Sequence, residues 1–303
     1  MKVLLLILIF FSSFNLCSQT YDAYVIDATA LYQTKAYKES AILWDKAFRI
    51  HPGFASDYYN AACTVALAGH SQTAFDYLEQ AISHGWEDIA WLQQDPDLAS
   101  LKEPGNWSAF KNTIPALKTD YLNSLNLELK NQLEDLRMQD QTIRLLLPDA
   151  ETRFGRESKA YNWFRNELMP RNDSLVLNRI ITLIEEKGWP GIQEVGELAN
   201  QTLWLVIQHA PLEIQKKYLP LLEASVMEGE SKARYLAFLQ DRILMREDQK
   251  QIYGTQSLWD NTKKQNVIWP ILNSEKVNQR RKEVGLEPIE AYAEANGFLY
   301  IQE

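Results

Sequence analysis

The second half of the chain holds several polar residues whose types and spacing could do chemistry. Asp140 and Arg144 stand four residues apart, so on a helix their side chains share one face and can form an ion pair. Asp241 and Arg242 interrupt an apolar run, where a buried charge must find a partner because an unpaired one is costly. His209 follows the apolar stretch WLVIQ. Each position has an alternative interpretation. Asp140 with Arg144 could be a surface ion pair, Asp241 with Arg242 a structural ion pair, and His209 a helix cap.

A fourth polar stretch is QIYGTQS, in which Gly254 permits a positive backbone angle or the close approach of a ligand. Tyr253, Thr255 and Gln256 place neutral hydrogen-bonding groups around this glycine. Such groups can orient a polar ligand, but they cannot transfer a proton near neutral pH. A simple turn is the alternative interpretation.

His209 has two interpretations. At the last turn of a helix a cation is favoured by the helix dipole, which would make His209 a C-terminal cap. Catalysis would require a carboxylate to orient the imidazole ring. Asp140 and Asp241 are the candidates for that carboxylate, and their spacing in the sequence does not show that either lies near His209.

The chain opens with MKVLLLILIFF, one lysine followed by an apolar run and a small polar exit, which is typical of a secretory signal peptide over residues 1–18. The apolar run is too short to span a bilayer, and no later segment is long and apolar enough to do so. We therefore expect an exported protein, periplasmic or secreted, with no transmembrane segment.

Cys17 raises the alternative of a lipid anchor. Bacterial lipoproteins resemble one another in carrying a small residue just before the modified cysteine, whereas Leu16 stands there in this chain. Plain cleavage near Ser18 or Gln19 is therefore favoured over lipidation. Cleavage would leave Cys63 as the one thiol.

The formal charge of the chain is −9, and removal of a leader whose one charged residue is Lys2 takes it to −10. This acidic balance argues against a nucleic acid as partner, which would need clustered lysine and arginine. No CxxC, HExxH or cysteine and histidine cluster is present, so the sequence predicts neither a metal nor a cofactor.

The first half of the chain repeats itself with a period of 34 residues. The segment YKESAILWDKAFRIHP aligns with SQTAFDYLEQAISHGW, and the segment before each keeps the same register. The aligned pairs of small residues are Ala28 with Ala62, Ser40 with Ala74, and Ala47 with Ala81. Small residues at fixed helix positions let antiparallel helices approach closely.

These positions resemble the tetratricopeptide repeat, which has a pair of helices per unit, three small residues and a closing proline. The resemblance covers about residues 21 to 87 in two units, of which the second ends in Trp86 instead of proline. The segment from Trp91 to Ile114 departs from the pattern and is predicted to cap the array, because two units cannot bury their own ends. The resemblance implies a surface that docks a protein or peptide. A scaffold that only supports the second half is the alternative.

We therefore predict a repeat region with a helical cap over residues 20–117 and a helical domain over 118–303. From Lys118 onward, leucines at spacings of three, four and seven predict one long amphipathic helix. Asp173-Ser174 is predicted to cap a later helix that ends before Gly188. The one extended piece is expected near Val267, so the fold class is all-α.

The span from about residue 129 to 256 resembles a family of bacterial domains of unknown function. The recurring pattern of that family is DQxxR, GWP, a later glycine, QHA, DR and YGTQ. In this chain the elements are Asp140-Gln141 with Arg144, Gly188-Trp189-Pro190, Gly196, Gln208-His209-Ala210, Asp241-Arg242, and Tyr253-Gly254-Thr255-Gln256. The resemblance implies a shared site assembled from several helices, without naming a reaction.

The resulting hypothesis is an exported binding protein that is not an enzyme. The repeats would dock a protein or peptide, and the helical domain would hold a small polar ligand, a carboxylate or a sugar. The residues expected to line that pocket are Gln141, Arg144, His209, Arg242, Tyr253 and Gln256.

The alternative is a hydrolase-like enzyme. His209 would act as general base, oriented by Asp140 or Asp241, with an arginine stabilising negative charge that develops in the reaction. No GxSxG motif supplies a nucleophile, so water would attack directly.

Overall fold

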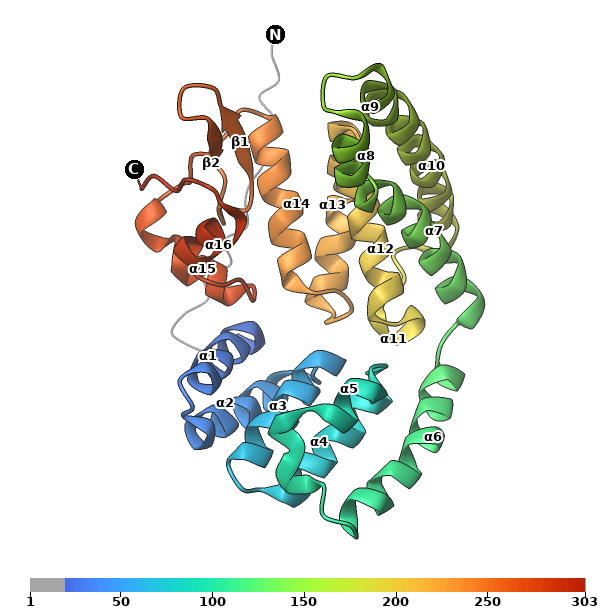
Figure 1. Ribbon diagram of the computed structural model, residues 1–303, viewed down its shortest axis with the longest axis vertical. Helices are drawn as coiled ribbons and strands as arrows, with labels where there is room; N and C mark the ends of the chain where they lie inside the picture. The colour runs from blue at the N-terminus through green and yellow to red at the C-terminus, as the bar shows by residue number, and fades with distance from the viewer. Residues whose placement is uncertain (1–19, 303) are drawn as a thin grey trace.

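The computed structural model describes residues 20–302, which fold into helices apart from one small hairpin of strands (Figure 1). The all-α fold class is thereby confirmed. The predicted signal peptide over residues 1–18, with Cys17, lies outside the described residues. Within residues 20–302, no helix combines the length and the apolar character needed to cross a membrane.

The N-terminal half opens with two antiparallel helical hairpins that lie side by side (Figure 1). Their helices are α1 (Tyr21–Gln33), α2 (Tyr37–Ile50), α3 (Ala55–Leu67) and α4 (Ser71–Ser83). The small residues of the 34-residue register are all fully buried, at Ala28, Ser40, Ala47, Ala62, Ala74 and Ala81. Their size lets the backbones of paired helices approach, and the buried Trp44 and Leu78 fill the space beside them.

The segment that follows covers the second hairpin. It consists of α5 (Ile89–Gln94), the 3₁₀ helix η1 (Pro96–Leu101) and α6 (Asn106–Ser124). Its apolar residues join the core of α3 and α4, with Leu92, Leu98, Leu101, Trp107 and Phe110 all buried there. This segment therefore shields the end of the second hairpin from water.

The single long helix predicted from Lys118 is wrong, because α6 ends at Ser124 and α7 (Leu127–Leu145) starts a separate helix. Leu125 is extended, and the side chain of Asn126 accepts a hydrogen bond from the backbone N–H of Leu129. The backbone N–H of Asn126 donates to the carbonyl of Glu194. Asparagine is a strong helix N-cap, and leucine spacing alone does not reveal that break.

The second half is a bundle that continues from α7. Its helices are α8 (Leu147–Phe154), α9 (Lys159–Trp163), the π-helical turn η2 (Phe164–Leu168), α10 (Met169–Lys187), α11 (Ile192–Val195), α12 (Glu197–Ile207), α13 (Leu212–Met227) and α14 (Ala233–Arg246). Helix α10 begins at Met169, so the cap predicted at Asp173-Ser174 is wrong: the helix continues directly from η2. Helices α7, α10 and α12 share one apolar core.

The C-terminal segment packs against α14 (Figure 1). It holds the antiparallel strands β1 (Ser257–Asp260) and β2 (Gln265–Ile268), then η3 (Ser274–Lys276), α15 (Val277–Glu283) and α16 (Ile289–Asn296). Ser257 pairs with Ile268 in the register of the two strands. Strand β2 includes Val267, so the predicted extended piece is confirmed.

The two halves meet at a group of charged side chains. Glu197, at the start of α12, accepts a hydrogen bond from the backbone N–H of Ala55 at 2.9 Å and pairs with Lys232 at 2.8 Å. On the N-terminal side, the hydroxyl of Tyr21 donates to Asp57 Oδ2 at 2.6 Å. A second contact lies at α15, where Lys282 pairs with Asp27 at 2.7 Å. The N-terminal hairpins are therefore held at α12 and at α15.

Asp22 lies in this charged group with its side chain half-buried. Burial and the charge of Asp57 raise the pKa of Asp22 to about 6, while Arg234 and Lys232 lower it. Between an unfolded pKa of about 4 and the folded value, the folded chain binds more protons than the unfolded chain. The stability that Asp22 contributes is therefore present below about pH 4 and lost as the pH rises through about 6.

We predict that Asp22→Asn raises the free energy of unfolding by about 1 kcal/mol at pH 7.5, because it removes a charge held in an unfavourable place. The gain should fall to near zero at pH 4, where Asp22 is already neutral. Urea denaturation at both pH values measures this. Asp120→Asn, on an exposed position of α6, is the matched control and should change little at either pH. An equal effect of Asp22→Asn at both pH values would contradict the assignment.

Candidate functional site

Asp241, on α14, is fully buried and organises the segment that follows the helix. Its carboxylate accepts hydrogen bonds from the backbone N–H groups of Ile252 at 2.7 Å, Tyr253 at 3.1 Å and Thr255 at 2.9 Å. The hydroxyl of Thr255 donates to it as well, at 3.0 Å. Burial raises the pKa of Asp241, and these four donors oppose that rise by stabilising the charged form. Asp241 therefore fixes a loop, because its carboxylate is engaged by the donors of residues 252–255.

The loop over residues 251–256 is further held from the side of α15 and α16. Arg281, fully buried, donates to the carbonyl of Tyr253 at 2.7 Å. Gly254 has φ of +75°, and a Cβ there would lie 2.7 Å from Ile289 and 2.8 Å from Ile271. Only glycine meets both conditions, so the central glycine of the YGTQ element is needed for backbone shape and packing.

Arg242 connects this loop to the end of α12. Its Nε donates to Gln256 Oε1 at 3.0 Å, and its Nη1 donates to the carbonyl of Gln208 at 3.0 Å. Arg246, one turn later, donates to the carbonyl of Ala210 at 2.6 Å. These two arginines satisfy carbonyls at and just beyond the C-terminal end of α12, where the cap interpretation places the charge of His209.

Asp140 and Arg144 form the expected pair on α7, at 3.2 Å. Arg144 also pairs with Asp173 of α10 at 2.9 Å, and Gln141 Nε2 donates to Asp140 Oδ2 at 2.5 Å. The Asp140 side chain is buried, and this burial raises its pKa, while Arg144 and Gln141 lower it. The pair therefore ties α7 to α10 instead of lying free on the surface.

His209 lies exposed at the end of α12, near three guanidinium groups. Crowding by protein atoms and then the charges of Arg144, Arg242 and Arg246 lower the pKa of His209 to about 3. The imidazole is therefore neutral near neutral pH. Among residues 20–302, no carboxylate forms a hydrogen bond or an ion pair with the ring of His209.

Two of these sequence elements, DQxxR and QHA, line one hollow of about 300 Å³. We name it the C-terminal hollow. It lies between α7, α10 and the end of α12. Its walls are Asp140, Pro170, Asp173, Ser174, Leu177, Asn178, Val206, His209, Ala210 and Pro211. Asp140 belongs to the DQxxR element and His209 to the QHA element, so these two elements share the hollow.

The other predicted site residues lie around this hollow or away from it. Arg144 lies against it through its pairs with Asp140 and Asp173. Arg242 contacts the backbone of Gln208, and Gln256 lies behind Arg242. Tyr253 belongs to the far side of the loop, where its carbonyl accepts from Arg281. The structure thus brings Asp140 and His209 together and places Asp241 and Tyr253 in a separate, structural arrangement.

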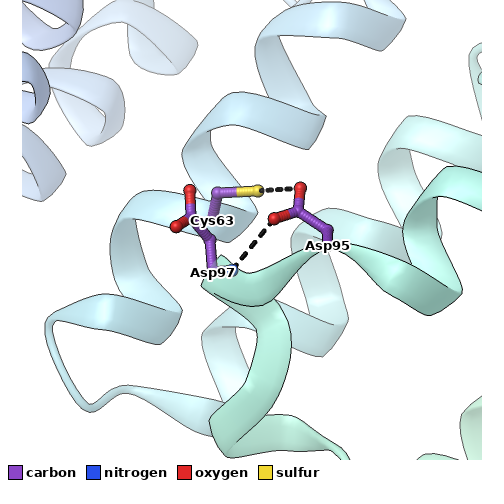
Figure 2. Close-up of side chains that lie close together, drawn as sticks. All are labelled: Cys63, Asp95 and Asp97. Carbon is purple, nitrogen blue, oxygen red and sulfur yellow. Dashed lines mark hydrogen bonds between the residues drawn. The ribbon is translucent and has the colours of Figure 1, made fainter.

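A second hollow, of about 430 Å³, lies in the N-terminal half, and we name it the N-terminal hollow. At its centre Cys63 of α3 meets Asp95 and Asp97 of the segment around η1 (Figure 2). The thiol donates to Asp95 Oδ2 at an S···O distance of 3.6 Å, and Asp95 Oδ1 accepts from the backbone N–H of Asp97 at 2.9 Å. The ligand atoms of the three side chains lie within 4.8 Å of one another, so they could together face a cation.

The sequence interpretation missed the N-terminal hollow. Asp95 and Pro96 read as a helix break, and the structure shows that Asp95 also caps η1 and accepts from the hydroxyl of Tyr59 at 2.6 Å. Cys63 and Asp95 are 32 residues apart, a separation that nothing local connects. The signal in the sequence that could have indicated this hollow was the repeat register. It places α3 beside α1 and leaves the face of α3 toward η1 without a partner from the repeats.

A family described as "Family of unknown function (DUF6624)" matches residues 129–299 of the chain. This span begins on α7 and includes the C-terminal hollow, α14 and the 251–256 loop. The search of curated proteins and the search of solved structures gave no match.

We predict that Asp241→Asn lowers the free energy of unfolding by about 3 kcal/mol, because the amide nitrogen would face backbone donors at a buried position. Urea denaturation measures the loss. Hydrogen exchange should also become faster at the amides of Ile252, Tyr253 and Thr255. Asp260→Asn is the control, since Asp260 also accepts from two backbone N–H groups but in an exposed turn, and its loss should stay below about 1 kcal/mol. Equal losses in the two variants would contradict the role of Asp241.

Proposed function

Because the chain belongs to the family of unknown function DUF6624, whose matched span contains the C-terminal hollow, we propose that this hollow binds a small polar ligand. In the same proposal the protein is exported, and the N-terminal hairpins are two tetratricopeptide-type repeats that dock a protein or peptide. One observation carries the proposal: Asp140 and His209, from two separated elements, line a single hollow of about 300 Å³.

The walls of the C-terminal hollow suit a neutral ligand with several hydroxyl groups. Asp173, held in place by Arg144, offers an acceptor, and Ser174 and Asn178 add groups that can donate and accept. Leu177 and the prolines at the rim give apolar contact for the carbon atoms of a ring. Since two carboxylates line the hollow, we favour a sugar-like ligand over a carboxylate.

The docking role of the hairpins is proposed because of their 34-residue register. Each small residue of the 34-residue repeat is buried at a helix contact, as the tetratricopeptide resemblance requires. A cap of helices protects the second unit. Export is proposed because the sequence begins with an apolar leader that is typical of a secretory signal peptide.

The hydrolase-like alternative is supported less well. A general base works best when its pKa lies near the operating pH, whereas that of His209 is lowered to about 3. Asp241 is occupied by four donors of its own loop, and Asp140 is engaged by Arg144 and Gln141. A neutral, exposed imidazole is better suited to accept or donate one hydrogen bond to a bound ligand than to activate water.

Thermal denaturation of the full chain with glucose, N-acetylglucosamine and myo-inositol as probes tests the C-terminal hollow. A ligand that binds only the folded state stabilises it by about 2.7 kcal/mol at 100 times its Kd, so a bound probe raises Tm. We predict that His209→Ala weakens that probe about tenfold and that Asn178→Leu, which keeps the size of the side chain but removes its hydrogen-bonding amide from the wall, removes most of the shift.

The control is His70→Ala, which removes an exposed histidine from the N-terminal half and should leave the shift unchanged. Mass spectrometry of small molecules that co-purify with the full chain widens the set of probes. A Tm shift that Asn178→Leu leaves unchanged would place the ligand elsewhere and contradict the proposal.

A further inference from the structure

The N-terminal hollow is larger than the C-terminal one, and its walls come from both hairpins and from the cap. Helix α1 contributes Thr29, Tyr32 and Gln33, and α3 contributes Tyr59, Asn60, Cys63 and Thr64. The remaining walls are Trp44, Trp91, Asp95, Pro96 and Asp97. The hairpins and the segment around η1 thus enclose one recess.

The recess carries negative charge that the protein does not neutralise. In the part of the chain that the structure describes, the donors to the Asp95 carboxylate are all neutral, namely Tyr59, Cys63 and the backbone of Asp97. Asp97 accepts from the hydroxyl of Tyr32 through Oδ2. Lys102 donates to the backbone carbonyl of Asp95 instead of its carboxylate, and among residues 20–302 neither carboxylate forms an ion pair.

Asp97 also has an oxygen to spare. Within the described residues 20–302 a donor engages its Oδ2 and none engages its Oδ1, so Oδ1 is available to a group that enters the recess. The Asp97 side chain is half-buried, whereas that of Asp95 is buried. Asp97 is therefore the carboxylate that an incoming donor can reach.

Aromatic rings form much of the remaining wall. Trp44 is buried in the floor, Tyr32 is half-buried, and Trp91 at the rim is 48% exposed. Aromatic faces attract cations, and the attraction grows when water is excluded. A ring at the rim with half its surface exposed is free to stack on a flat cationic group.

We propose that the N-terminal hollow receives a basic side chain, lysine or arginine, from the peptide that the hairpins dock. This inference rests on the proposed docking function and names the chemistry that the docked partner must carry. The ammonium or guanidinium donates to Asp97 Oδ1, its alkyl stem lies along Trp91, and its charge offsets that of both carboxylates.

An organic cation fits the recess better than a bare metal ion. The volume of about 430 Å³ is far larger than one ion needs and suits a side chain of several carbons. A metal would also need Cys63 as a thiolate ligand, whereas in this structure its thiol donates to Asp95 Oδ2 at an S···O distance of 3.6 Å.

A mixture of random octapeptides, passed over immobilised full chain and sequenced after elution, tests the inference. We expect lysine and arginine to be enriched about threefold or more in peptides captured by the protein, and not in those captured by Asp97→Asn. An enriched peptide, remade with norleucine or citrulline at its basic position, should bind at least about tenfold more weakly by calorimetry.

Asp76→Asn is the matched control, because Asp76 lies exposed on α4 and bonds only to Gln72, outside the recess. Asp97→Asn leaves the buried Asp95 and its bonds intact, so folding should be preserved, and urea denaturation checks this. Peptides captured without basic enrichment, or captured equally by Asp97→Asn, would overturn the cation inference and leave docking intact. Capture of no peptide would overturn both. Capture that depends on added zinc would assign the recess to a metal.

Discussion

One buried carboxylate organises the C-terminal part of this protein. Asp241 receives three backbone N–H groups and one hydroxyl from residues 252–255, so the chain that leaves α14 must turn around it. Removing these donors from water would be costly without such an acceptor. The turn in turn presents the carbonyl of Tyr253 to Arg281 and the side chain of Gln256 to Arg242. Through those two arginines, the orientation of α15 and the end of α12 both depend on Asp241.

The same dependence explains why the polar elements singled out in the sequence divide into two groups. The DR and YGTQ elements form hydrogen bonds with each other, and their polar groups are engaged in those bonds. These two elements therefore stabilise the fold. DQxxR and QHA meet at the C-terminal hollow, where Asp140 and His209 both line the wall. Arg242 bridges the two groups, since it bonds to Gln256 on one side and to the carbonyl of Gln208 on the other.

The parts that the sequence predicted well depend on local periodicity. The paired small residues, such as Ala28 with Ala62, imply close helix contacts wherever they occur, and burial of all six follows from that. The ion pair of Asp140 and Arg144 follows from helix spacing alone. The break at Asn126 was missed because a cap depends on one side-chain conformation. The role of Asp241 and the meeting of Cys63 with Asp95 were missed because each depends on the path of a loop.

The contact of α15 with α1 has a mechanical consequence. Lys282 pairs with Asp27, and the hydroxyl of Thr20 donates to the carbonyl of Glu283, while Glu197 fixes the start of α3. In a helical solenoid each unit contacts only its neighbours, so a terminal unit that packs against nothing else can bend relative to the rest. Here the first hairpin is pinned at its outer end by the C-terminal part of the same chain. The position of the first hairpin is thereby fixed within the folded chain, so the binding proposed for the N-terminal hollow would require little further ordering of the hairpins.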